Sequence, residues 1–167
     1  MLSVVRRLSI EAEQLTALKE LRAACTLTGP KGEFNRRDTG EAGVTVLVGL
    51  LREPKSPEVT SAVLQALHAS TMQLEDWEKP TNKRALLAAD GLSMLLCHLR
   101  QAPTAPLVSL ILSKLAGDTK AKEVLIVESV ISELVLLLDG ENAETAENIM
   151  RILYRLTAEK GGKSQVR

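Results

Sequence analysis

The side chains best suited to chemistry in this sequence are those of two cysteines and two histidines. Cys97 and His98 are adjacent in a stretch with helical spacing, so their side chains diverge by about 100° and cannot jointly bind a metal ion. Neither Cys25 nor Cys97 has a second cysteine at the spacing of a metal or redox motif. A nucleophilic Cys–His pair would need one of them near His68, which nothing in the spacing requires. We therefore expect packed thiols, no metal centre, no cofactor and no catalytic residues.

Two glycine-rich segments invite comparison with phosphate-binding loops. They are GPKG at 29–32 and GEAG at 40–43, and neither matches a P-loop or a dinucleotide-binding fingerprint. Both are typical of helix ends and turns, because glycine and proline interrupt helices.

The composition of this 167-residue chain limits the classes of partner that it could bind. Hydrophobic residues make up 45% and charged residues 25%, which is ordinary for a globular protein. Aromatic residues make up only 2%, which disfavours both a strand-rich fold and a base-stacking surface. Lys and Arg together number 21, as do Asp and Glu, so no net charge attracts nucleic acid or an anionic membrane. We expect neither as a partner.

The location is predicted from missing signals. Two cysteines 72 residues apart do not make a disulfide framework and fit a reducing compartment. The opening MLSVVRRLSI is interrupted by Arg6 and Arg7, so it lacks the apolar run of a signal peptide, and no stretch is long enough to span a membrane. We expect a cytoplasmic protein, with the nucleus as the alternative.

Leucine-rich segments recur along the chain. GVTVLVGLL, GLSMLLCHL and VISELVLLL begin at residues 43, 91 and 130, which are 48 and 39 residues apart. Each is followed by a breaker and then by a helical pattern with a Leu-x-x-Leu pair, and a further such pair precedes them. A spacing that averages about 40–47 residues predicts stacked helical repeats that share one core. The pairs are Leu18/Leu21, Leu64/Leu67, Leu112/Leu115 and Leu153/Leu156.

Segments 82–99 (NKRALLAADGLSMLLCHL) and 121–138 (AKEVLIVESVISELVLLL) are the most regular. They resemble the armadillo repeat, in which a short first helix and a second helix, usually opened by glycine, precede a long third helix. The resemblance implies an all-α, right-handed α-α superhelix (an armadillo-like solenoid) of about three to four repeats. We expect this domain at 1–159, with repeats near 1–28, 33–73, 82–117 and 120–159, and a polar tail at 160–167.

The first repeat lacks its short helix, which leaves an apolar N-terminal end formed by Met1, Leu2, Val4 and Val5. One explanation is that the chain is a piece of a longer solenoid. Another is that a homo-oligomeric or hetero-oligomeric partner covers this end, and a third is that a few apolar residues are simply tolerated at the surface.

The resemblance also implies where a partner would bind, because third helices line the concave groove of armadillo solenoids. Peptide-gripping members carry Trp on this helix and Asn four residues later. Here the Trp places hold Lys19, Gln65, Ser113 and Tyr154, and the Asn places hold Ala23, Ala69, Gly117 and Ala158. Recognition of nuclear signals of the importin kind is therefore not carried over.

Nine side chains are expected to project from the third helices into the groove: Lys19, Arg22, Gln65, His68, Ser113, Lys114, Arg151, Tyr154 and Arg155. Five are Lys or Arg, which favours a protein partner with an acidic segment. Tyr154 is the best single anchor, since Tyr and Arg are enriched at binding hot spots. The alternative is that these are ordinary solvated helix faces with i,i+4 ion pairs.

The sequence thus predicts a non-catalytic scaffold or adaptor that binds a protein through its groove or an end surface. A structural subunit of a cytoskeletal or ciliary assembly is one alternative. A regulator or exchange factor of a chaperone or small GTPase is another, and it rests on fold analogy alone.

Overall fold

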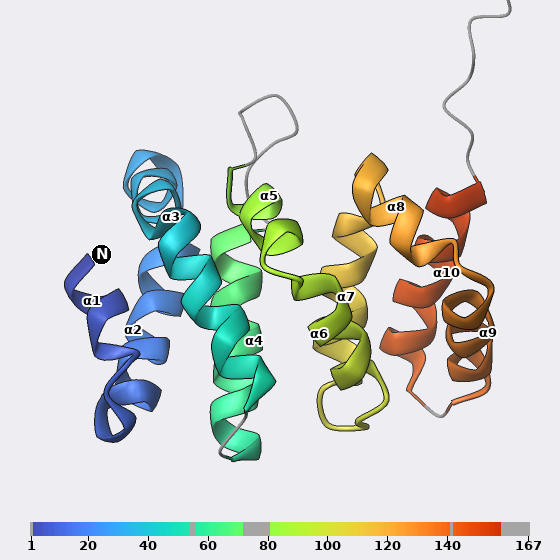
Figure 1. The fold of residues 1–167 in the computed structure, drawn as a ribbon, viewed down its shortest axis with the longest axis horizontal. Helices are drawn as coiled ribbons and strands as arrows, with labels where there is room; N and C mark the ends of the chain where they lie inside the picture. Colours follow the sequence, from blue (N-terminus) through green and yellow to red (C-terminus); the bar gives the residue numbers. More distant parts are fainter. Residues whose placement is uncertain (1, 54–55, 72–80, 141, 158–167) are drawn as a thin grey trace, which may run out of the picture. The chain divides into compact units, whose positions relative to one another are not determined.

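The computed structural model describes residues 2–53, 56–71, 81–140 and 142–157, and the tail predicted at 160–167 lies outside them. Within these residues the chain forms ten α-helices, two 3-10 helices and no strand (Figure 1). None of the described helices has the length and apolar character needed to cross a membrane. The helices are α1 (Leu2–Arg7), α2 (Gln14–Thr26), α3 (Gly29–Arg52), α4 (Pro57–Thr71), α5 (Thr81–Ala88), α6 (Gly91–Leu99), α7 (Ala105–Leu115), α8 (Thr119–Leu125), α9 (Glu128–Leu136) and α10 (Ala143–Thr157), with η1 (Glu11–Glu13) and η2 (Leu137–Asp139).

The helices form two compact units, Met1–His98 and Leu99–Arg167. In the first unit α2 packs along α4, and α3 packs against both α4 and α5 (Figure 1). Leucines three residues apart share one helix face, and the predicted pairs of α2 and α4 are fully buried. Burying one such side chain stabilises the fold by about 1.5–3 kcal/mol, so these pairs contribute substantially to the core of the unit.

In the second unit α7 packs along α10, while η2 packs against α9 and α10. Leu112 and Leu115 of α7 and Ile149 and Ile152 of α10 are fully buried. The Val-rich segment at 44–51, which could be mistaken for a strand, lies within α3 of the first unit. Helical spacing of the apolar residues therefore outweighs the preference of valine for strands.

The turn predicted at 29–32 is wrong. α2 does end at Thr26, but α3 begins at Gly29, with Pro30 in its first turn, where a helix needs no N–H donor. Gly32 lies inside this turn, and a Cβ placed there would collide with the carbonyl oxygen of Leu27. Its missing side chain permits a close approach between two segments and does not end a helix.

The second glycine-rich segment does change the chain direction. Gly40 has φ 56° and ψ −169°, which is a region that residues with a side chain rarely adopt. It divides α3 into a polar first half and a Val- and Leu-rich second half, while Gly43 continues the helix. Because of this corner, residues 29–71 form three helical segments, which are the two halves of α3 and then α4.

The expectation of an exposed apolar N-terminal end is wrong for the residues whose side chains the structure describes. Val5 is only 9% exposed, Leu8 is fully buried, and Val4 is half-buried. Arg7 instead forms ion pairs with Glu13 and Glu20 at this end. This end therefore presents ion-paired side chains together with the apolar side chain of Ile10, which is 49% exposed.

Candidate functional site

Two side chains of α10 hold this helix against α7. Asn148 Nδ2 donates to Ser109 Oγ over 3.3 Å, and Arg155 Nη1 donates to the carbonyl oxygen of Ser113 over 2.7 Å. Because Asn148 and Arg155 are seven residues apart, they lie on one side of α10, and this side faces α7. These contacts fix the rotation of α10 and hence the side chains that it presents to solvent.

Ser113 is buried, contrary to the expectation that it projects outward. It is only 3% exposed, and its hydroxyl donates to the carbonyl oxygen of Leu110 over 2.8 Å. Arg155 of α10 donates to the backbone carbonyl oxygen of the same residue. Ser113 contributes a backbone oxygen that positions Arg155 and no side chain that a partner could contact.

The four remaining predicted residues of this unit are exposed and define what we call the α7–α10 face: Lys114, Arg151, Tyr154 and Arg155. Tyr154 is 74% exposed, the same fraction as the most exposed leucine. Arg151 pairs with Glu147 over 2.5 Å, which neutralises one of the three positive charges. The face thus presents an aromatic ring among side chains with an excess of positive charge.

The predicted residues of the first unit define a second surface, the α2–α4 face: Lys19, Arg22, Gln65 and His68. Arg22 Nη1 donates to Gln65 Oε1 over 2.6 Å, which joins the two helices at the surface. Lys19 Nζ lies 3.6 Å from Glu58 Oε1. Gln65 and His68 are half-buried. The cations of this face are therefore largely engaged by neighbours in the same unit.

The cysteines and histidines do not form a catalytic or metal-binding arrangement in the described part of the chain, where no three His, Cys, Asp or Glu side chains cluster. Burial raises the pKa of the Cys25 thiol, which keeps it protonated, whereas a nucleophile needs a lowered pKa. His98 is 4% exposed, and its Nε2 lies 3.0 Å from the carbonyl oxygen of Leu51. The expected burial of Cys97 is wrong, because it lies on the exposed side of α6.

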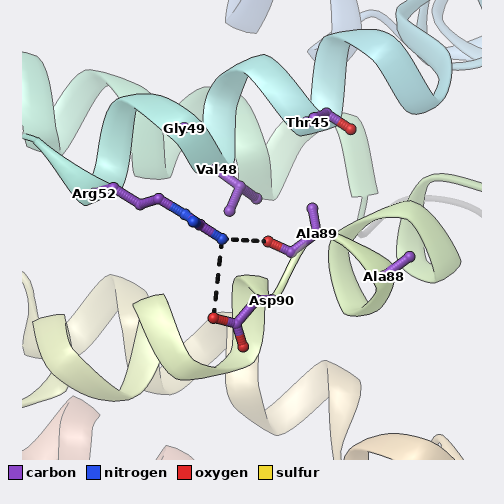
Figure 2. A pocket seen from close by; sticks show the side chains of 7 residues that line it. All are labelled: Thr45, Val48, Gly49, Arg52, Ala88, Ala89 and Asp90. Atoms are coloured by element: carbon purple, nitrogen blue, oxygen red, sulfur yellow. Dashed lines mark hydrogen bonds and ion pairs between the residues drawn. The ribbon is translucent and has the colours of Figure 1, made fainter.

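A pocket of about 400 Å³, which no sequence motif predicted, lies between α3 and the α5–α6 corner (Figure 2). Arg52 Nη2 is directed at the carbonyl oxygen of Ala89 over 3.4 Å and at Asp90 Oδ2 over 3.9 Å. The two charged side chains of the pocket, those of Arg52 and Asp90, therefore pair with each other. The lining residues are Thr45, Val48, Gly49, Arg52, Ala88, Ala89 and Asp90.

Comparisons with known proteins identify the fold. No protein-family model and no curated protein matches the sequence. An engineered protein of known crystal structure is 21% identical, with a TM-score of 0.75 over 92% of this chain and 61% of its own. A designed armadillo repeat protein in complex with the peptide (KR)4 is 22% identical, also with a TM-score of 0.75, over 92% of this chain and 62% of its own. The chain has an armadillo-like repeat fold. It spans about three-fifths of the length of these two solved chains.

The armadillo-like fold confirms the predicted all-α solenoid class and gives the helices their roles. α2, α4, α7 and α10 carry the four leucine pairs, which the resemblance assigns to the third helices of the repeats. The two faces are therefore the exposed sides of neighbouring third helices within each unit. Tyr154 stands at the place that the resemblance assigns to Trp in peptide-gripping members.

Proposed function

We propose that this chain is a non-catalytic protein-binding scaffold whose α7–α10 face binds an acidic segment of a partner protein. The observation that carries the proposal is Tyr154, 74% exposed on a third helix between Arg151 and Arg155. This site brings together Tyr and Arg, two of the residue types that are enriched at the hot spots of protein interfaces.

The geometry supports an extended or helical acidic segment. Arg155 is held in place by its bond to Ser113, so less side-chain entropy is lost when it binds a carboxylate. Lys114 on the adjacent helix is exposed and adds a second positive charge. Arg151 can exchange its exposed Glu147 partner for a ligand carboxylate, since such surface pairs contribute only about 0.2–0.5 kcal/mol.

The designed armadillo repeat protein is in complex with a basic peptide. The α7–α10 face of this chain carries positive charge, so a peptide of that kind would be repelled here. The proposed ligand therefore has the opposite charge from the peptide of the solved neighbour.

The test is a fluorescence-anisotropy titration with two labelled octapeptides, an alternating Asp–Glu peptide and (KR)4. We expect the acidic peptide to bind with a dissociation constant on the order of 10–100 µM, and more weakly as salt screens the charges. We expect no binding of (KR)4. Tyr154→Ala should weaken binding about tenfold or more, because it removes the anchor.

Lys120→Glu is the matched control for charge, because Lys120 is exposed on α8 of the same unit. It should leave binding of the acidic peptide nearly unchanged, whereas Lys114→Glu should weaken it. Equal losses in the two charge variants, or full affinity in Tyr154→Ala, would refute the proposed site.

A structural subunit of a larger assembly is supported less directly, because Val5 is buried, while Met1 and the side chain of Leu2 lie outside what the structure describes. No residue of the described chain favours an exchange factor over a simple binding scaffold. The acidic-peptide scaffold is therefore the function that we put forward.

A further inference from the structure

The pocket of the first unit has one wall that follows from helical spacing (Figure 2). Val48, Gly49 and Arg52 follow Thr45 by three, four and seven residues on α3, so the four lie on one face of this helix. Residues 88–90 at the α5–α6 corner form the opposite wall, and the space between the walls is about 400 Å³. This pocket shares no residue with the α7–α10 face.

Small side chains keep the pocket open. A Cβ added at Gly49 would meet no neighbouring segment within 4 Å, so open space lies directly beside the helix backbone there. Ala88 and Ala89 of the opposite wall contribute only methyl groups. The hydroxyl of Thr45 donates to the carbonyl oxygen of Glu41 over 2.9 Å and is therefore already used. The interior of the pocket is suited to a small aliphatic group.

Arg52 brings a positive charge to the pocket, and its contacts there are long. Its Nη2 lies 3.4 Å from the carbonyl oxygen of Ala89 and 3.9 Å from Asp90 Oδ2, both beyond the usual length of about 2.7–3.2 Å for an N–H···O hydrogen bond. Both charged side chains are more than half exposed, so their ion pair contributes little. Asp90 Oδ1 also accepts the hydroxyl of Ser93 over 2.6 Å. Asp90 therefore keeps a partner when Arg52 turns to a ligand.

A carboxylate is the ligand group that replaces these contacts most favourably. A guanidinium group has five N–H donors, and it binds a carboxylate through two parallel charge-assisted hydrogen bonds. When Arg52 turns to a carboxylate, the carbonyl oxygen of Ala89 becomes accessible to an N–H donor of the ligand. The C-terminal residue of a peptide combines a carboxylate, a side chain and an N–H group, whereas a free carboxylic acid lacks the N–H group.

We propose that this pocket binds the C-terminal residue of a partner peptide that ends in leucine or valine. Arg52 binds the terminal carboxylate, the carbonyl oxygen of Ala89 accepts the N–H group of the same residue, and the aliphatic side chain lies beside Gly49. Most of the lining residues are exposed, so the rest of the peptide can extend from the pocket into solvent. This inference does not depend on the acidic-peptide site of the second unit.

The test is a titration of the isotope-labelled full chain with N-acetyl-Gly-Gly-Leu, followed by the shifts of its assigned backbone amides. The same peptide with an amidated C-terminus is the control ligand. We expect a dissociation constant on the order of 0.1–1 mM for the free acid, and binding at least about tenfold weaker for the amide. The largest shifts should fall at Gly49 and at residues 88–91. The peptide has no acidic side chain, so its failure to bind here would leave the proposed function of the α7–α10 face standing.

Two variants test the two parts of the contact. Gly49→Leu fills the pocket and should abolish binding, whereas the control Gly49→Ala adds a single methyl group and should retain it. Arg52→Gln removes the charge, so it should bind the free acid as weakly as the amide. Its control is Arg6→Gln, which removes an exposed positive charge from α1, outside the pocket lining, and should bind as the parent does. Circular dichroism should show that all four variants are folded, and Arg52→Gln decides the matter if Gly49→Leu is not.

Four results would overturn the proposal. Equal binding of the free acid and the amide would mean that the terminal carboxylate is not recognised. Parent-like affinity in folded Gly49→Leu, or a preference for the free acid that survives in Arg52→Gln, would place the contact elsewhere. The absence of shifts at millimolar peptide would mean that the pocket does not bind a C-terminal leucine.

Discussion

Replacing Gly40 by alanine should destabilise the first unit, although there is room for the methyl group. A Cβ at this position would have no atom within 4 Å, so the effect arises from the backbone alone. With φ 56° and ψ −169°, Gly40 occupies a region that costs a non-glycine residue about 1–3 kcal/mol. The lower entropy of the unfolded alanine chain offsets about 0.4–1 kcal/mol of this. The expected net loss is about 1–2 kcal/mol.

Gly49 is the matched control within the same helix. A Cβ there also has no atom within 4 Å, but the backbone has regular helical angles. Gly49→Ala should therefore stabilise the protein by about 0.5–1 kcal/mol, as alanine does in helix interiors. Both variants add the same methyl group, so they differ only in the backbone angles of the position that is replaced.

Urea denaturation followed by circular dichroism measures both effects. Because the slope for small proteins is about 1–3 kcal/mol per molar urea, the two midpoints should differ by roughly 1 M, with the parent between them. A Gly40→Ala midpoint at or above that of the parent would refute the reasoning. It would mean that the corner which divides α3 does not require glycine.

Three further predictions concern other buried positions. Gly91→Ala should lower the free energy of unfolding by about 1–3 kcal/mol, because the added Cβ would lie 2.7 Å from the backbone oxygen of Leu86. An unchanged urea midpoint would contradict this prediction. Burial raises the pKa of Cys25 above its ordinary value of 9.0, so the folded state retains a proton that the unfolded chain releases, and stability should fall as pH rises past about 9. Comparing urea midpoints at pH 7 and pH 10 should show a smaller decline for Cys25→Ala than for the parent. Asn82 Nδ2 donates to two buried backbone carbonyls over 2.7 and 2.9 Å. Asn82→Asp places a carboxylate against these carbonyl oxygens, so it should lower the melting temperature more than Asn82→Ala does. The reverse order of melting temperatures would refute these contacts.

Much of the fold follows from the spacing of the leucines. A Leu-x-x-Leu pair places two side chains on one helix face whatever the neighbours are, so the third helices could be recognised without long-range information. The glycines could not be interpreted in the same way. Gly32 and Gly40 lie in similar sequence contexts, yet one allows a close approach to Leu27 and the other adopts a left-handed φ. Only the packed structure distinguishes the two.

The exposure of the site residues could be predicted where it follows from the helical register alone. Lys114, Tyr154 and Arg155 are exposed because they lie away from the leucine pairs of their helices. The burial of Ser113 was not predictable, since it lies on α7, which packs along α10, and the Arg155 that bonds to its carbonyl oxygen is 42 residues away in the sequence. The pairing of Lys19 with Glu58 is another long-range contact that periodicity does not encode.

The central claim is that the α7–α10 face is a binding surface for acidic protein segments. The most direct measurement is a titration of the isotope-labelled chain with the Asp–Glu octapeptide, followed by the shifts of its assigned backbone amides. The account predicts that the largest shifts fall at the end of α7 and along the second half of α10. Shifts confined to α1–α5, or no shifts at peptide concentrations that saturate the anisotropy signal, would contradict it.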